Sequence, residues 1–244
     1  MIFYFSGTGN SKWIAEEIGR ATGNEAVNIC DVKNDGSTAI SFHNSDTVGI
    51  VFPVYAWSPP RVVTEFVKTL KTNGAYTFAV CTCGAEAGLS MKKLQKALAL
   101  NSTFSIAMPD NFIIGMDVES PESIDEKIAG AKKRLPEICE KIKAKENCVE
   151  EEIGSLAFIK SNIVAPIFNV FVGKTKSFHV DDTCNGCGLC EKNCPTHTIK
   201  LVNGKPTWND HCYTCLSCIN RCPQRAIQYG SKTAKRGRYY FKES

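Results

Sequence analysis

Short apolar runs alternate with amphipathic stretches along the first two-thirds of the chain. Apolar runs at residues 1–5, 47–52, 76–81 and 102–108 have the length of buried strands, and residues 25–29 form a weaker run. Residues 59–70, 87–100 and 121–145 carry apolar side chains at helical spacing, as does the stretch between Ser11 and Gly23. Strands that alternate with helices in this way predict an α/β fold with a parallel, doubly wound sheet.

The pattern changes after residue 147. Residues 150–152 are all glutamate, residues 163–172 are mostly apolar, and Lys174 and Lys176 follow. We expect residues 148–180 to form a linker segment that packs between two domains; the alternative is a helix that lies on a membrane surface. No apolar run reaches the roughly 20 residues that cross a bilayer, and the N-terminus lacks a signal-peptide pattern. These features predict a cytoplasmic protein that makes no membrane contact.

A cysteine motif occurs twice in the last third of the chain. Each copy reads Cys-x2-Cys-x2-Cys-x3-Cys-Pro, and the second copy begins 28 positions after the first, at Cys212 instead of Cys184. A cubane of iron and sulfide requires thiolates that converge from different directions, and a tight loop with this spacing can surround one of its faces. Zinc sites favour paired Cys-x2-Cys spacings, and disulfide frameworks are typical of small secreted domains. The duplicated motif therefore predicts two [4Fe–4S] clusters.

Residues 181–230 resemble a bacterial-type 2[4Fe–4S] ferredoxin domain. In such domains the last cysteine of each motif binds the cluster of the other motif. The resemblance implies two ligand sets, which are Cys184, Cys187, Cys190 and Cys222 for cluster I and Cys212, Cys215, Cys218 and Cys194 for cluster II. The other five cysteines of the chain are interpreted as small buried thiols in a reducing cell; they are Cys30, Cys81, Cys83, Cys139 and Cys148.

The first apolar run leads directly into a loop of glycine and hydroxyl residues, with the sequence Ser-Gly-Thr-Gly-Asn-Ser at positions 6–11. A strand, such a loop and a helix can hold a phosphate group at the helix N-terminus. The loop does not supply the G-x4-G-K-[ST] of a P-loop, and Lys12 replaces the third glycine of a dinucleotide fingerprint. Neutral hydroxyl donors suit the phosphomonoester of FMN, and the loop resembles the flavodoxin phosphate signature. The expected phosphate contacts are Ser6, Thr8, Gly9, Asn10 and Ser11.

The flavodoxin resemblance implies a five-stranded sheet in the order 2-1-3-4-5, with FMN at the carboxyl ends of strands 1, 3 and 4. The further expected FMN contacts follow strands 3 and 4; they are Pro53, Val54, Tyr55, Ala56, Trp57, Thr82, Cys83 and Gly84. Tyr55 or Trp57 can stack on the flavin ring, the alternative being ordinary packing between domains. Asn111, after strand 5, can bond to the loops around the flavin or simply form a turn.

Two features depart from conventional flavodoxins. Such proteins usually carry a second aromatic residue after strand 4, but residues 82–102 contain none, so another part of the chain such as the ferredoxin domain can cover one flavin face. Flavodoxins are also acidic, whereas this chain has a formal net charge of +4. Bound clusters would offset that charge, so it does not predict nucleic-acid binding. We expect the basic tail at 231–244 to meet acidic groups of the loaded protein or of a redox partner.

The joined modules resemble the fused flavodoxin–ferredoxin proteins of anaerobic bacteria and archaea. The resemblance implies an FMN domain at 1–147, a ferredoxin domain at 181–230, and an electron-transfer protein that passes electrons between two clusters and FMN within one chain. The alternative is a ferredoxin-dependent flavoenzyme that reduces a small substrate or quinone, with Tyr55, Cys83 or Glu86 as a proton donor. No catalytic residue is assigned, the expected partners are redox proteins, and a homodimer is left open.

Overall fold

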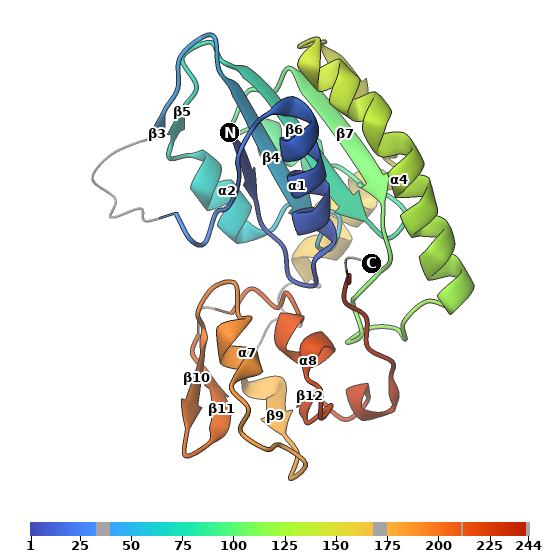
Figure 1. The fold of residues 1–244 in the computed structure, drawn as a ribbon. Coiled ribbons are helices and arrows are strands. Elements are labelled where there is room, and N and C mark those ends of the chain that lie inside the picture. Colours follow the sequence, from blue (N-terminus) through green and yellow to red (C-terminus); the bar gives the residue numbers. More distant parts are fainter. Residues whose placement is uncertain (33–39, 168–174, 211, 243–244) are drawn as a thin grey trace.

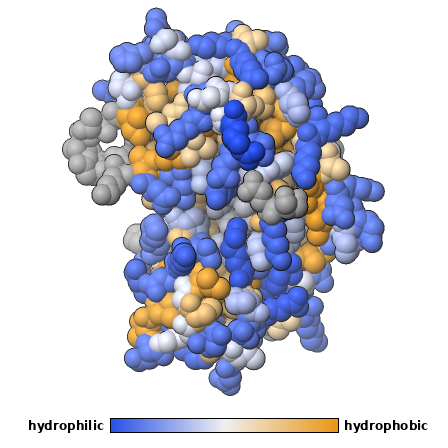
Figure 2. Space-filling model, in the orientation of Figure 1, coloured by the Kyte–Doolittle hydropathy of each residue, from blue (hydrophilic) through white to orange (hydrophobic). Residues whose placement is uncertain are grey.

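The computed structural model describes residues 1–32, 40–167, 175–210 and 212–242. These residues form a larger N-terminal unit around a parallel sheet and a smaller C-terminal unit of short strands and helices (Figure 1). The predicted α/β fold is confirmed. Hydrophilic side chains cover most of the face that Figure 2 shows, and hydrophobic side chains form smaller patches on both units.

Six strands build the main sheet, in the order β2-β1-β4-β6-β7-β8, and every neighbouring pair is parallel. The strands are β1 (Ile2–Tyr4), β2 (Ala26–Asn28), β4 (Thr47–Pro53), β6 (Tyr76–Cys83), β7 (Ser102–Ala107) and β8 (Cys148–Glu150). The predicted order 2-1-3-4-5 is confirmed for the first five strands, but the prediction of five strands was wrong because β8 adds a sixth beside β7. A separate parallel pair consists of β3 (Ile40–Ser41) and β5 (Leu70–Lys71).

Strand β8 lies at the start of the segment that the sequence indicates as a linker. The sequence did not predict this strand, because consecutive glutamates such as those at residues 150–152 are unusual beside a paired strand. In the structure, Glu150 forms ion pairs with Arg134, at 3.1 Å, and with Lys141, both on α4 (Pro121–Lys143). Glu151 accepts a hydrogen bond of 2.5 Å from the Thr103 hydroxyl on β7. These partners offset the acidic run, so the strand can pair with the sheet edge.

Helices cover both faces of the sheet. Helices α1 (Asn10–Thr22) and α4 bury Ile14 and Ile138 in the core on one face, while α2 (Arg61–Val67) and α3 (Ser90–Gln95) bury Phe66 and Leu94 on the other. Strand β6 is buried along its whole length, as a central strand of a sheet with two covered faces requires. The carboxyl ends of the strands point toward the C-terminal unit (Figure 1).

Residues 155–167 run along the N-terminal unit in short helical turns, α5 (Ala157–Ile159) and the π-helical η1 (Lys160–Val164). The Ser161 hydroxyl accepts a hydrogen bond of 3.0 Å from the main chain of Leu89. Six large apolar side chains of this segment are exposed; they are Leu156, Phe158, Ile159, Ile163, Val164 and Ile167. The sequence predicted that this segment packs between domains, but these six side chains are exposed. Residues 168–174 of the same predicted segment lie outside the described residues. Among the described helices, none is long and apolar enough to cross a membrane.

The C-terminal unit repeats in its structure the duplication seen in its sequence. Helices α7 (Leu189–Lys192) and α8 (Ser217–Arg221) each contain the third cysteine of a motif. Strand β10 (Ile199–Val202) pairs with β11 (Lys205–Trp208), and β12 (Ile227–Tyr229) pairs with β9 (Phe178–Val180), both antiparallel. The paired residues Ile199 and Trp208 correspond, 28 positions apart, to Ile227 and Val180. The two halves are therefore structural copies that present equivalent cysteine loops.

The C-terminal tail returns to the N-terminal unit (Figure 1). After η3 (Thr233–Lys235), the main-chain N–H of Phe241 donates to the Thr8 carbonyl at 2.8 Å, and the Phe241 ring stacks on Trp13 with centroids 4.9 Å apart. Tyr239 is buried, and its hydroxyl donates to Asn10 Oδ1 at 2.8 Å. The tail is therefore part of the contact between the two units.

Candidate cofactor sites

A cavity of about 410 Å³, partly open to solvent, lies at the carboxyl ends of β1, β4, β6 and β7. Ten of the thirteen residues predicted to bind FMN line it; they are Ser6, Thr8, Asn10, Ser11, Pro53, Val54, Tyr55, Thr82, Cys83 and Gly84. The topology explains this agreement, because the carboxyl ends of neighbouring parallel strands meet at one edge of the sheet. Ligands of doubly wound proteins bind in the crevice outside that edge.

The loop at residues 6–11 has the conformation that an anion site requires. Gly9 adopts a φ of 110°, which is accessible to glycine, and its N–H donates to the Ser6 hydroxyl at 3.1 Å. Thr8, Asn10 and Ser11 are buried at the start of α1, where unpaired main-chain N–H groups and the helix dipole favour negative charge. The loop can therefore receive a phosphate group from main-chain and hydroxyl donors.

Three hydrogen bonds tie the loop to the ends of neighbouring strands. Ser11 and Thr82 share a bond between their hydroxyl oxygens at 2.8 Å, and the Asn10 amide donates to the Pro109 carbonyl at 2.9 Å. The Asn111 amide donates to the Thr8 hydroxyl at 2.6 Å. Asn111 thus contacts the phosphate loop, which was one of its two predicted roles. These bonds hold the loop at residues 6–11 against residues at the ends of β6 and β7, which are far away in sequence.

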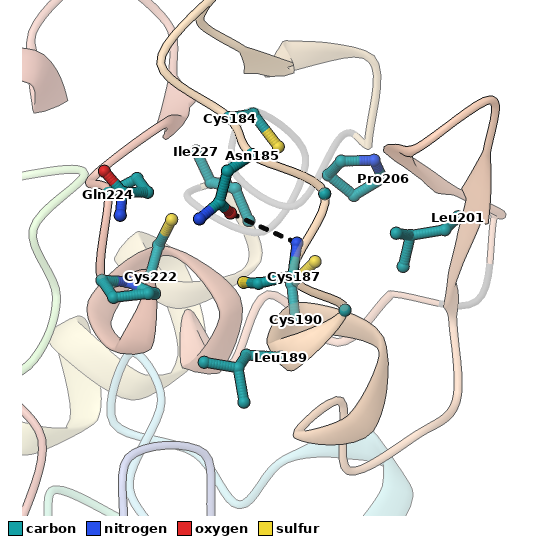
Figure 3. A pocket seen from close by; sticks show the side chains of 13 residues that line it. Cys184, Asn185, Cys187, Leu189, Cys190, Leu201, Pro206, Cys222, Gln224 and Ile227 are labelled. Carbon is teal, nitrogen blue, oxygen red and sulfur yellow. Dashed lines mark hydrogen bonds between the residues drawn. The ribbon is translucent and has the colours of Figure 1, made fainter.

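The first cysteine site gathers residues from both motifs. Three cysteines of the first motif, Cys184, Cys187 and Cys190, line one cavity together with Cys222 of the second motif (Figure 3). The loop between them is shaped by Gly186 and Gly188, which have φ values of 70° and 76°. The Asn185 side chain accepts a hydrogen bond of 3.2 Å from the main chain of Cys187, which holds the turn. The arrangement brings together the ligand set predicted for cluster I.

The second cysteine site has the equivalent composition. Burial raises the pKa of the Cys215 thiol to about 12, and Cys212 and Cys194 contribute to that rise as neighbouring thiols. Burial also raises the pKa of Cys218, with further contributions from Cys215, Cys212 and Cys194. Cys194 and Cys218 are buried in one apolar cluster, and Cys212 packs against it. Among the described residues, no three His, Cys, Asp or Glu side chains approach closely enough to hold a single metal ion.

Comparison with known proteins identifies both units. A family model described as flavodoxin domain matches residues 1–108, and one described as 4Fe-4S dicluster domain matches residues 183–227. The chain therefore combines a flavodoxin domain with a 4Fe-4S dicluster domain.

A similar protein is a polyferredoxin-like protein of Methanocaldococcus jannaschii, which is 41% identical over 63 residues. The match covers 25% of this chain and 28% of that relative, so the chain spans little more than a quarter of the relative's length. The similarity therefore concerns a segment the size of the ferredoxin domain.

The ferredoxin domain sits directly against the flavodoxin cavity. A Cβ atom on Gly7 would lie 2.4 Å from the Cys215 carbonyl oxygen, so glycine is needed where these main chains meet. Tyr213 lies edge-on to Phe5, with centroids 6.5 Å apart, and its hydroxyl donates to Glu65 at 3.2 Å. The second cysteine motif is thus the part of the ferredoxin domain that adjoins the cavity.

Of the two aromatic residues predicted to stack on the flavin, Tyr55 and Trp57, only the first lies at the cavity. Tyr55 lines the flavodoxin cavity; its hydroxyl is buried and has no hydrogen-bond partner in the described structure, and burial raises its pKa well above the ordinary value. Trp57 does not line the cavity, because its indole N–H donates to Glu86 at 2.7 Å. The Trp57 ring packs beside Gly88 and under the Lys160 ammonium, 5.9 Å from the ring centroid. Tyr55 is therefore the aromatic residue placed to contact a flavin.

The predicted FMN contacts and the residues that line the cavity differ at several positions. Gly9, Ala56 and Trp57 were predicted contacts that do not line the cavity. Gly7, Met108, Pro109 and Asp110 line it without having been predicted. The last three follow β7, the strand after which the sequence had already indicated Asn111 as a residue near the flavin loops.

Glu86 is tied to the linker instead of facing the flavodoxin cavity. Its carboxylate accepts hydrogen bonds from Lys160 Nζ, at 2.5 Å, and from Trp57. The Lys160 ammonium, helped by the Trp57 N–H, lowers the pKa of Glu86 below its ordinary value. An ionised carboxylate that is held by two donors outside the cavity is a poor proton donor, so the structure argues against this predicted role.

We expect Glu86→Gln to loosen the segment around Lys160, because the ammonium loses its charged partner. The ionised carboxylate stabilises the folded state above its ordinary pKa of 4.5, and this contribution is lost as the pH falls through the lowered pKa of the folded protein. Trypsin at neutral pH should therefore cleave after Lys160 a few-fold faster in this variant than in the unmodified protein. Glu16→Gln, which breaks an exposed helical pair with Lys12, is the control. Equal cleavage of both variants would contradict the anchoring role.

Proposed function

We propose that the protein carries electrons between two [4Fe–4S] clusters and one FMN within a single chain, with cluster II next to the flavin. The observation that supports this most strongly is the contact between Gly7 in the phosphate loop and Cys215 in the second cysteine motif. This contact supports the proposal because Cys215, a proposed ligand of cluster II, lies against the loop that would bind the FMN phosphate, so no diffusion of one domain to the other is needed. A fused donor and acceptor have a high effective concentration, so transfer is intramolecular.

The ligand sets of this proposal follow the grouping of the cysteines. Cys184, Cys187, Cys190 and Cys222 would hold cluster I, while Cys212, Cys215, Cys218 and Cys194 would hold cluster II. Main-chain N–H groups near the sulfurs are available for tuning, since Thr198 N donates to Cys194 Sγ and Thr214 N to Cys212 Sγ, both at 3.3 Å. The crossed arrangement puts both clusters in one small unit, and cluster II faces the flavodoxin domain.

The cavity residues supply complementary contacts for FMN. Ser6, Thr8 and Ser11 would donate to the phosphate, Tyr55 would cover one face of the ring, and the main chain of Gly84 would reach the ring edge. Lys127 Nζ donates to the Gly84 carbonyl at 2.6 Å, which fixes the loop after β6. When bound, clusters exchange single electrons and a flavin accepts one or two, so together they link one-electron and two-electron chemistry.

The cavity favours electron transfer over substrate reduction. Of the three proton donors considered from the sequence, Glu86 lies in the Trp57 and Lys160 network outside the cavity. Tyr55 and Cys83 line the cavity, and burial raises the pKa of Tyr55, which makes its phenol a weaker acid. Tyr213 lies against Phe5, and Cys215 lies against Gly7, which lines the cavity. These positions support a role in which the flavin receives electrons from the adjacent cluster.

The test is anaerobic purification followed by rapid reduction. About eight iron atoms and one FMN per chain are expected, since each cubane holds four irons. After mixing with dithionite, cluster absorbance near 400 nm and flavin absorbance near 450 nm should relax together, at a rate that does not change over roughly a tenfold range of protein concentration. A rate of flavin reduction proportional to protein concentration would contradict transfer within one chain.

Two other outcomes of this experiment would redirect the proposal. Eight irons without flavin would show that the N-terminal cavity takes a different ligand. Steady oxidation of the reduced protein by a small quinone, at a rate that free FMN does not match, would favour the flavoenzyme alternative.

A further inference from the structure

Arg221 of the ferredoxin domain reaches the phosphate loop of the flavodoxin domain. It is the last residue of α8 and is half-buried. A Cβ atom on Gly9 would lie 3.3 Å from Arg221 Nη2, so the guanidinium is in contact with the main chain that begins α1. The Arg221 guanidinium also lies over the ring of Tyr240, 4.9 Å from its centroid.

The guanidinium is poorly compensated in its surroundings. Within the described ranges of the chain, no aspartate or glutamate forms an ion pair with Arg221, and its guanidinium lies over the Tyr240 ring. Lys127, by contrast, forms an ion pair with Glu119 at 2.6 Å. Burying a charge is costly unless it is paired, so an anion beside Gly9 would stabilise this arrangement.

We propose that Arg221 binds the phosphate group of FMN, so that the phosphate site is composed of both domains. This inference rests on the proposed FMN site. The loop at residues 6–11 carries hydroxyl and main-chain donors but no cation of its own, whereas a phosphomonoester carries close to two negative charges at neutral pH. An arginine presents planar, charged donors that suit phosphate oxygens, and charge-assisted hydrogen bonds are about twice as strong as neutral ones.

The tail holds the guanidinium in place. Phe241 bonds to Thr8 and stacks on Trp13, and Tyr239 bonds to Asn10, so the chain around Tyr240 is fixed to the same loop. Asn220, next to Arg221, donates to the Asn111 carbonyl at 3.2 Å. The loop, the tail and the end of α8 thus form one connected structure at the start of α1.

Arg221 has a competing role, because it ends α8, the helix that contains Cys218 of the second cysteine motif. A guanidinium that served only cluster II would change the properties of that cluster and leave flavin affinity unchanged. One that served only as a support for the Tyr240 ring would affect FMN and riboflavin equally. Riboflavin has the same ring as FMN but lacks the phosphate, so comparing the two ligands isolates the phosphate contact.

The experiment measures dissociation constants of FMN and riboflavin by quenching of flavin fluorescence, on cluster-loaded protein from which flavin has been removed. Arg221→Gln should weaken FMN binding roughly 10-fold to 100-fold, the range for a lost charge-assisted bond, and change riboflavin binding less than about twofold. Arg221→Lys should recover part of the loss. Lys242→Gln is the matched control, since Lys242 also lies over the Tyr240 ring, at 5.1 Å, and loses the same charge.

Each remaining result overturns the inference in a recognisable way. Equal weakening of FMN and riboflavin in Arg221→Gln would show a purely structural role, and unchanged binding of both, with or without a shifted cluster potential, would exclude phosphate recognition. Failure of the unmodified protein to bind either flavin would instead reject the proposed FMN site. Cluster absorbance of every variant, compared with that of the unmodified protein, shows that the ferredoxin domain is still folded.

Discussion

Cys222→Ala is expected to abolish cluster I while leaving cluster II and FMN in place. Cys222 lines the same cavity as Cys184, Cys187 and Cys190, although it belongs to the second motif. A cubane that loses one of four thiolate ligands is poorly held, so the iron content should fall from about eight to about four per chain. Iron and sulfide analysis with EPR of the reduced protein measures this change.

The reciprocal variant sharpens the test. Cys194→Ala should remove cluster II and, with it, the fast reduction of the flavin, because the second motif adjoins the cavity through Cys215 and Gly7. In Cys222→Ala, by contrast, electrons should still pass from cluster II to the flavin. Cys139→Ala, which alters a buried thiol on α4, is the control and should retain all eight irons. Selective loss of cluster II in Cys222→Ala would reject the crossed ligation.

The combined replacement of Thr8 by valine and Ser11 by alanine is expected to release the flavin without loss of the clusters. Both hydroxyls are buried at the start of α1, and each would donate to the phosphate group. A hydrogen bond to a charged group contributes about 1.5–3 kcal/mol. Loss of two such bonds should therefore weaken FMN binding by roughly 100-fold or more, since 1.4 kcal/mol corresponds to a tenfold change.

Fluorescence titration with FMN and cluster absorbance together decide this prediction. Valine has nearly the shape of threonine, so the packing around position 8 is retained. Asn111 and Thr82 lose hydrogen-bond partners in the variant, and a thermal unfolding curve shows how much stability this costs. Ser105→Ala is the control because it removes a buried hydroxyl from β7 that does not line the cavity. FMN affinity equal to that of the control would mean that the phosphate binds elsewhere.

The sequence by itself determined the chemistry that depends on local spacing. The cysteine motifs and the loop at residues 6–11 each place their functional groups within a few residues, so the pattern specifies the ligand type before the chain has folded. The alternation of apolar runs and amphipathic stretches was sufficient for the α/β fold, because parallel strands require helical crossovers, whereas the strand order came from the resemblance to flavodoxins. Tyr55 and the hydroxyl residues of the loop were found by the same local reasoning.

Only the tertiary structure decided the features that join residues remote in sequence. Strand β8 pairs with the sheet because Arg134 and Lys141 offset Glu150, and Trp57 is drawn away from the cavity by Glu86 and Lys160. The tail bonds to Asn10 from a position 229 residues away. Such contacts depend on which surfaces meet after folding, and no pattern within a short window of sequence records that. The placement of Cys215 and Arg221 beside the phosphate loop, on which the proposed electron route and phosphate site depend, belongs to this second class.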